Sequence, residues 1–276
     1  MRYLNEVNWQ PDLICGTSIG AINGAAFGSG MSVDELAHLW KTYHRKQMYK
    51  ITFPAFFRTL LSGRKFSPLS DNRPTRSLLE KTIDIDALRN STTEIIISVL
   101  NMRTSQVRYF THKAIGIEHL MAAGGIPMMF PWQYIDGDPY WDAGVMVNTP
   151  IMPAFERGAT EIIVVLLSPL GAIPQRLPST HREVSELVFE QFLIGSYTAC
   201  LPNAGWRTNP EADVYDTPLP DSPQLQLSMK GVRMATVYPT RMLGFRSLLD
   251  FSPRQAKTLL RDGYVNARMQ LKSFFK

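Results

Sequence analysis

This sequence contains few cysteines and no long apolar run, and each of these features excludes a class of protein. Only Cys15 and Cys200 are present among 276 residues, so neither a disulfide framework nor a cysteine metal site can be built. The longest apolar run, Ile162 to Leu167, is far shorter than the roughly 18 residues that a membrane-spanning helix needs, and the N-terminus lacks a secretory signal pattern. With 45% hydrophobic and 19% charged residues, the chain has enough apolar material for a core. We therefore expect a folded, cytoplasmic protein, either soluble or peripherally attached to the inner face of a membrane.

The net charge of +5 is unevenly distributed along the chain. Residues 41–76 contain nine basic side chains against one acidic, and residues 254–276 contain six against one, which leaves the remainder at −8. In the first segment the basic residues alternate with aromatic and leucine side chains, a composition typical of contact with anionic lipid headgroups. One hypothesis is a membrane-docking surface that includes Arg45, Lys46 and Lys50. An ordinary subdomain with solvated charges fits equally well, and no nucleic-acid-binding motif accompanies the charge.

The hydrophobic pattern predicts alternating strands and helices, which is typical of an α/β fold with helices packed on a sheet. Segment 202–230 is rich in Pro, Asp, Asn and Ser without a clear period, and we expect a mobile loop or insertion there. The predicted strands are 12–15, 94–100, 106–110 and 161–167, and the predicted helices are 1–7, 18–28, 32–45, 184–199 and 252–271.

A candidate nucleophile directly follows the first predicted strand. Gly16-Thr17-Ser18-Ile19-Gly20 fits the GxSxG pattern between a strand and a helix, the context in which this pattern forms a nucleophile elbow. The helix that begins there would direct its N-terminal N–H groups, that of Ile19 included, toward a developing oxyanion. A glycine-bracketed loop without reactivity is the alternative, and the strand and helix on either side favour the nucleophile.

A candidate base lies much later in the chain. Asp142 stands between aromatic and small residues, where we expect a partly buried turn in which it accepts a proton from a nearby hydroxyl. Gly144 and Asn148 belong to the same motif. An ordinary Asp-Ala-Gly turn is the alternative.

Three motifs together resemble the bacterial patatin-like phospholipases. They are Gly16-Thr17-Ser18-Ile19-Gly20-Ala21-Ile22-Asn23, then Ala122-Ala123-Gly124-Gly125-Ile126-Pro127 with Phe130-Pro131, and then Asp142-Ala143-Gly144 with Asn148-Thr149-Pro150. The resemblance covers about residues 12–167. It implies a three-layer α/β/α fold with a mostly parallel central sheet, lipid esters as substrates, and no cofactor or metal. It also implies a dyad without histidine, with Ser18 as nucleophile, Asp142 as base, Gly16 and Gly20 in the elbow, and Ile19 as an oxyanion donor.

The sequence departs from this family pattern at two places. Ala143 stands where the family usually has a glycine, and an alanine would be strained if that position needs a positive φ. The Gly-rich loop that builds most of the family's oxyanion hole is missing, and Met1 to Pro11 resemble the end of the helix that would follow it. We therefore expect a chain truncated at its N-terminus or a genuinely short product. A catalytically silent lipid-binding or scaffold protein is the alternative to an active hydrolase.

The histidines offer a competing interpretation. Ser18, Asp142 and His181 follow the Ser-Asp-His order of α/β-hydrolases, but those enzymes place several strands before the nucleophile. We expect His181 in a solvated loop, His44 and His112 at the surface, and no metal-binding spacing among the histidines.

The expected organisation is one patatin-like domain over residues 1–276. Its catalytic motifs lie within 12–167, and 168–276 form a C-terminal helical extension. The expected partners are a lipid ester and an anionic membrane surface, without nucleic acid. The sequence does not indicate the acyl-chain length, the headgroup or the oligomeric state.

Overall fold

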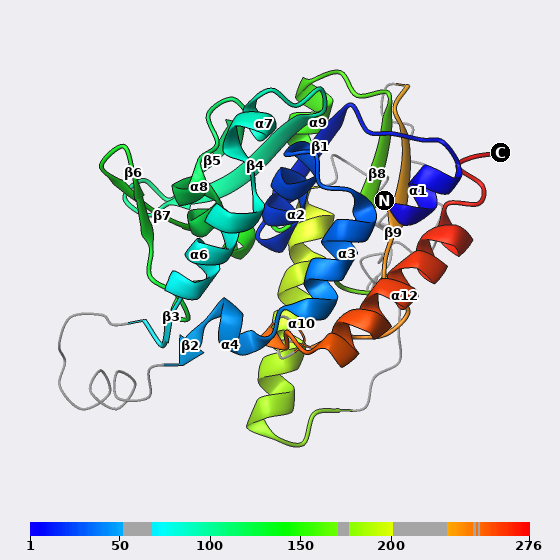
Figure 1. Ribbon diagram of the computed structural model, residues 1–276. Coiled ribbons are helices and arrows are strands. Elements are labelled where there is room, and N and C mark those ends of the chain that lie inside the picture. Colours follow the sequence, from blue (N-terminus) through cyan, green and yellow to red (C-terminus); the bar gives the residue numbers. More distant parts are fainter. Residues whose placement is uncertain (52–67, 171–176, 201–230, 245–246, 248) are drawn as a thin grey trace, which may run out of the picture.

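The computed structural model describes residues 1–51, 68–170, 177–200, 231–244, 247 and 249–276 (Figure 1). The predicted loop at 202–230 lies outside these ranges. So do residues 52–67, which hold most of the aromatic side chains of the first basic segment.

Strands and helices alternate along the described chain, which confirms the predicted α/β class. The strands are β1 (Leu13–Thr17), β2 (Lys50–Ile51), β3 (Ser70–Asp71), β4 (Glu94–Asn101), β5 (Gln106–Thr111), β6 (Gln133–Ile135), β7 (Asp138–Asp142), β8 (Glu161–Val165) and β9 (Arg233–Val237). The helices are α1 (Arg2–Glu6), α2 (Ile19–Gly28), α3 (Val33–Thr42), α4 (Arg45–Met48), α6 (Arg73–Thr82), α7 (Ile85–Arg89), α8 (Ile117–Ala123), the 3-10 helix η1 (Ala143–Val145), α9 (Met152–Glu156), α10 (His181–Cys200) and α12 (Pro253–Gln270).

The central sheet has five strands in the order β1-β4-β7-β6, with β5 also paired to β4. β1 runs parallel to β4, whereas β5 and β7 run antiparallel to β4, and β6 runs antiparallel to β7. β8 and β9 form a separate parallel pair. The architecture is therefore a mixed central sheet with helices around it.

Strands β1 and β7 share one edge of β4. β5 pairs with residues 96–101 of β4 and so occupies the other edge. On the shared edge β1 pairs with residues 94–98, and β7 continues along 99–101 in the opposite direction. The C-terminal ends of β1 and β7 therefore meet head to head, with Thr17 and Asp142 opposite consecutive residues of β4.

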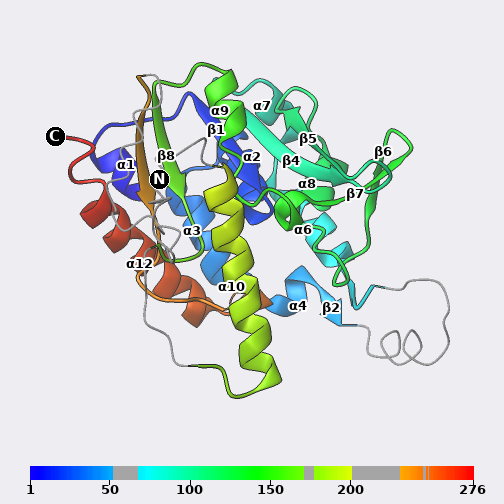
Figure 2. The same cartoon turned by 180° about the vertical axis from the view of Figure 1, so that it is seen from behind.

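Helices cover both faces of β1. Ile14 packs into a core cluster that contains buried residues of α2, α8 and β4. Its neighbours Leu13 and Cys15 point the other way, because side chains alternate along a strand, and they pack against buried residues of α9, α10 and β8. Seen from behind, α10 runs across the front of the molecule (Figure 2). The predicted three layers are thus formed.

Local sequence signals set several helix ends. Ser32 and Glu35 form a capping box at the start of α3, as predicted. That helix ends at Thr42 rather than near Arg45, because the extended backbone of Tyr43 interrupts it before α4 begins. Ser252 caps α12, and Pro253 occupies its first position.

The two chain ends lie beside each other. A third core cluster contains Leu4 of the N-terminal helix together with Leu271 and Phe274, which follow α12. Figure 1 shows α1 next to α12, and Tyr264 on α12 donates a hydrogen bond to Glu6.

Candidate active site

Ser18 lies at the sharp turn between β1 and α2. Its backbone has φ 56° and ψ −127°, a conformation that costs a non-glycine residue on the order of 1–3 kcal/mol. A Cβ atom on Gly16 would lie 2.5 Å from the backbone C and O of Gly20, so the close approach of the two chain segments requires a glycine at position 16. A Cβ on Gly20 would meet nothing within 4 Å. Of the two predicted elbow glycines, only Gly16 is sterically required.

Asp142 ends β7 and is buried, with 3% of its surface exposed. Its Oδ1 accepts a hydrogen bond of 2.8 Å from the Gly144 N–H, and its own N–H donates to the Gly125 carbonyl at 3.2 Å. A Cβ on Gly144 would crowd that Oδ1 at 3.0 Å. The backbone of the Gly-Gly motif and the turn after β7 therefore fix the carboxyl group from two sides.

The structure brings Asp142 and Ser18 together. Burial raises the pKa of Asp142 from 3.8 to about 6, whereas hydrogen bonds with the Ser18 hydroxyl and the Gly144 N–H oppose the rise. At neutral pH the carboxylate is therefore ionised but more basic than an exposed one. A group of this kind can take a proton from the hydroxyl beside it.

The start of α2 faces the same place. Ser18 is its N-cap residue and Ile19 its first residue. The first N–H groups of a helix have no partner within it and carry the positive end of its dipole. Ile19 provides the first N–H of α2 directly after Ser18, and its role as an oxyanion donor stays a prediction.

Comparison with known proteins adds the family. A family model described as patatin-like phospholipase matches residues 1–155. This chain belongs to the patatin-like phospholipase family. The match includes Ser18, Asp142 and the Gly-Gly motif between them, and it makes the chain a member of a family of lipid acyl hydrolases. A comparison with curated proteins gave no match.

The departure of this patatin-like chain at Ala143 carries no strain. Ala143 is fully buried, begins η1, and is not among the positive-φ residues of the described chain. The condition for strain, a positive φ, is not met at this position, because the turn after Asp142 is a 3-10 turn rather than a left-handed one. Asn148 follows in the same loop and donates its N–H to the Ser196 hydroxyl on α10 at 2.9 Å.

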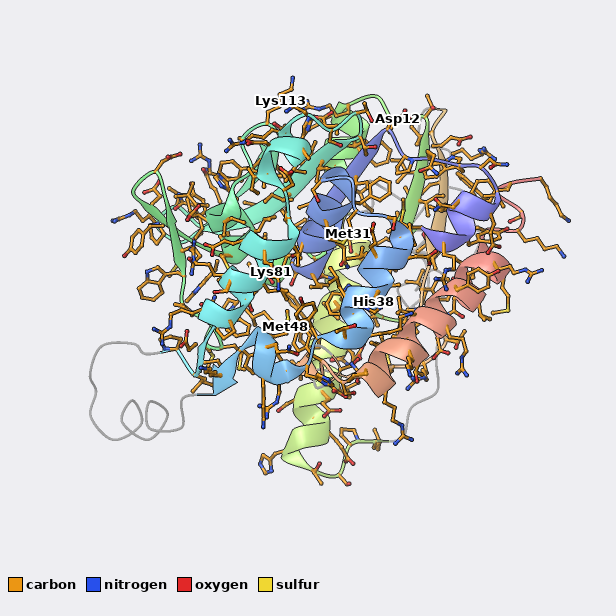
Figure 3. The ribbon with its side chains drawn as sticks, viewed as in Figure 1. Asp12, Met31, His38, Met48, Lys81 and Lys113 are labelled. Carbon is orange, nitrogen blue, oxygen red and sulfur yellow. The ribbon has the colours of Figure 1, made fainter. Side chains whose placement is uncertain are left out.

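The histidines of this patatin-like chain lie apart from the pair. Within the described ranges no histidine forms a hydrogen bond with Ser18 or Asp142. His181 is exposed but begins α10 rather than lying in a loop. His112 was predicted at the surface and is instead buried, where its Nδ1 accepts from the Ile95 N–H at 3.4 Å. His38 lies on an exposed part of α3 (Figure 3).

The cysteine on β1 and the basic residues of the predicted membrane-docking surface are the other candidate groups. Burial raises the pKa of the Cys15 thiol to about 12, so this cysteine on β1 is not a competing nucleophile. Arg45 and Lys46 on α4 and Lys50 on β2 are exposed. In the part of the chain that the structure describes, no helix is long and apolar enough to cross a bilayer, and no side-chain cluster could hold a metal ion.

The sequence did not predict the contacts that hold the segment around Ser18 next to the segment around Asp142. Thr17 is buried, and its Oγ1 lies 2.6 Å from the Ser98 Oγ and donates to the Val147 carbonyl at 3.1 Å. Ser196 and the Gly125 carbonyl hold the loop around Asp142. Thr17 and Gly125 belong to the motifs named above, but their partners are distant in the sequence and meet them only in the folded chain, so the sequence did not indicate these contacts.

Proposed function

We propose that this chain is a serine acyl-ester hydrolase that releases a fatty acid from a phospholipid or lysophospholipid, with Ser18 as nucleophile and Asp142 as base. The observation that carries the proposal is the buried Asp142 carboxyl beside the Ser18 hydroxyl of the strained elbow, with the pKa of Asp142 raised to about 6. The family supports lipid esters as the substrate class.

In the proposed reaction the Ser18 Oγ attacks the ester carbonyl carbon while Asp142 takes the hydroxyl proton. The oxyanion that forms receives a hydrogen bond from the Ile19 N–H. When the intermediate collapses, the ester C–O bond breaks, Asp142 passes its proton to the leaving alcohol, and an acyl-Ser18 remains. Asp142 then deprotonates a water that attacks the acyl group, and the fatty acid leaves as Ser18 regains its proton.

Labelling with a fluorophosphonate probe tests the proposal, because such probes react with activated serines. We expect the natural chain to label, Ser18→Ala to lose labelling, and Asp142→Asn to label about 10²- to 10⁴-fold more slowly. Ser29→Ala, at the other end of α2, is the matched control and should label normally. Labelling that survives Ser18→Ala, or an unreactive natural chain, would contradict the proposal.

One observation favours a second candidate, a catalytically silent lipid-binding protein. The N–H groups of Gly124 and Gly125 donate at 3.0 Å to the Leu120 and Ala122 carbonyls, so neither is free to stabilise an oxyanion beside Asp142. This candidate predicts binding to phospholipid vesicles that Ser18→Ala leaves unchanged, with no probe labelling and no fatty acid release.

We also propose that the substrate is reached at an anionic membrane surface on the cytoplasmic side. Arg45, Lys46 and Lys50 are exposed, and the β2–β3 pair that contains Lys50 leads to Leu69, whose N–H binds the Met128 carbonyl at 3.1 Å. Met128 is 67% exposed. Cationic and apolar side chains thus occur on segments that contact each other, as interfacial binding requires.

Charge reversal tests the membrane proposal. With about 1 kcal/mol for each basic residue near the surface, changing Arg45, Lys46 and Lys50 to Glu should weaken cosedimentation with anionic vesicles at least tenfold. Reversal of three exposed basic residues elsewhere, Arg89, Lys113 and Lys257, is the control. Equal losses in both triple variants would mean that only net charge matters.

A further inference from the structure

The Thr17 hydroxyl connects the two motifs that the proposed function uses. It donates its single proton to the Val147 carbonyl at 3.1 Å. Its lone pairs therefore face the Ser98 hydroxyl, 2.6 Å away, which must be the donor of that second bond. Thr17 and Ser98 are 7% and 0% exposed, so the bond between their hydroxyls is buried, and the bond to Val147 is partly buried.

These bonds close a ring around the site. Thr17 is the residue before Ser18 and pairs with Ser98 across the sheet, while the next residue of β4, Val99, pairs with Asp142. From Asp142 the chain passes through η1 to Val147, whose N–H binds the Ala143 carbonyl at 2.8 Å. The hydrogen bond from Thr17 to the Val147 carbonyl is the link that closes this ring.

We propose that Thr17 is a positioning residue, whose hydroxyl fixes the separation of Ser18 and Asp142 by tying the end of β1 to the loop after β7. The inference rests on the proposed function, since it concerns the pair of side chains named there. A dyad has no third side chain to orient its base, so the register of the two strand ends must come from the backbone and from groups such as this hydroxyl. Ser18 cannot move alone, because its backbone is held between Thr17 and the start of α2.

Replacement of Thr17 by Val removes the hydroxyl and keeps the shape of the side chain. We expect labelling by the fluorophosphonate probe to slow by about 10²-fold, the loss that a misplacement of about 1 Å causes in a catalytic group. Thr17→Ser keeps the hydroxyl and should restore most of the rate. Thr236→Val is the matched control, because Thr236 is also a buried strand residue whose hydroxyl pairs with another hydroxyl, that of Tyr197, at 3.1 Å.

A merely structural role for Thr17 predicts a different result. In that case Thr17→Val and Thr236→Val would lower the urea midpoint of unfolding by similar amounts and would both label at the natural rate under native conditions. That outcome overturns the inference, and so does equal slowing in both variants.

A second measurement is independent of activity. The Asp142 carboxyl group is titrated by carbon NMR in the natural chain, in Ser18→Ala and in Thr17→Val. Since hydrogen bonding with Ser18 lowers the pKa of Asp142, we expect both variants to titrate at a higher pH than the natural chain. An unchanged titration in Thr17→Val overturns the inference even if the natural chain does not label, whereas an unlabelled natural chain alone overturns only the proposed function.

Discussion

The burial of one carboxyl group, that of Asp142, sets the acid limit of the proposed reaction. Because its pKa is raised to about 6, Asp142 must lose its proton near that pH before it can accept one from Ser18. We expect the labelling rate to have its midpoint near pH 6, to fall about tenfold per pH unit below it, and to be constant above it. A midpoint near pH 4 would show that Asp142 is solvated during the reaction.

The same burial makes Asp142 a source of instability at neutral pH. The native state binds the proton more tightly than the unfolded chain, so stability is lost as the pH rises from 3.8 to about 6. The loss is about 3 kcal/mol in the free energy of unfolding once both states are ionised.

Asp142→Asn should therefore be more stable than the natural chain above pH 6, by up to about 3 kcal/mol, while losing activity. Its Oδ1 can still accept from the Gly144 N–H. Urea unfolding at about pH 7.5 and about pH 4 measures this, and the gain should vanish at the lower pH. A difference that does not depend on pH would contradict the assignment of the raised pKa.

The two glycines of the elbow should respond differently to the same substitution. Gly16→Ala places a Cβ 2.5 Å from the Gly20 backbone, so we expect the elbow to distort and labelling to be lost. Gly20→Ala has open space and lies in the first turn of α2, where alanine is favoured over glycine by about 0.5–1 kcal/mol. Probe labelling and thermal unfolding of both variants test this expectation. Normal labelling and stability in Gly16→Ala as well as in Gly20→Ala would contradict the close approach at Gly16.

At the scale of elements, the meeting of β1 and β7 on one edge of β4 was beyond the reach of the sequence. Periodicity predicts that 94–100 and 106–110 are strands, because it depends on neighbouring residues. It does not predict which edge each strand takes, because register depends on partners far along the chain. Local sequence offered Asp142 as a candidate base for the serine, but the Ser18–Asp142 dyad was expected on the strength of the resemblance, and the role of Thr17 was not expected at all.

Two sequence-based expectations failed for different reasons. His112 precedes Lys113, a charged neighbour that suggested the surface, yet the bend after β5 turns the imidazole inward. The strand β9 was not predicted, because it follows directly on the polar segment 202–230 and pairs with the distant β8.

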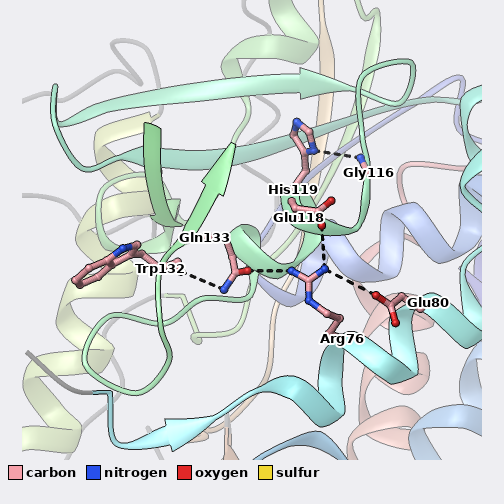
Figure 4. A network of polar contacts seen from close by, with 7 residues as sticks. All are labelled: Arg76, Glu80, Gly116, Glu118, His119, Trp132 and Gln133. Carbon is pink, nitrogen blue, oxygen red and sulfur yellow. Dashed lines mark hydrogen bonds and ion pairs between the residues drawn. The ribbon is translucent and has the colours of Figure 1, made fainter. Parts of the chain in front are cut away.

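Arg76 joins three elements near the Gly-Gly motif. From α6 it binds Glu118 of α8 at 2.9 Å and Gln133 of β6 at 3.1 Å, and it also lies 3.8 Å from Glu80 (Figure 4). Its side chain is only 32% exposed. We expect Arg76→Gln to lower the free energy of unfolding by about 1 kcal/mol at low salt and by less at high salt.

Arg103 provides the control for this prediction. Its side chain is 64% exposed and lies 3.4 Å from Asp138, so Arg103→Gln should change stability very little. A salt-independent loss in Arg76→Gln would mean that packing of its stem, rather than its charge, joins the elements.

At the scale of the whole molecule, the C-terminal residues close the structure against the N-terminal helix. Phe274 is 3% exposed, and the Arg233 guanidinium lies 4.2 Å from its ring centroid. Removing a buried ring of this size usually costs 3–5 kcal/mol, so we expect Phe274→Ala to lower the urea midpoint markedly. Lys272→Ala, at an exposed position, is the control. Phe274→Ala should still be labelled by the probe at low temperature, because Phe274 belongs to a cluster separate from the core around β4. A loss of labelling without unfolding would show that the chain ends influence the site.

The link between Thr17 and Val147 also bears on the synthesis of the protein. The two residues are 130 positions apart in the sequence, so a nascent chain displays Ser18 long before its carboxylate partner leaves the ribosome. Such non-local pairings form late, after the loop between them has closed. During translation Ser18 therefore lacks Asp142 beside it, and the proposed pair forms only when β7 docks beside β1. In the proposed hydrolase, completion of the sheet would then be the step that activates the serine, so unfinished chains would be inactive.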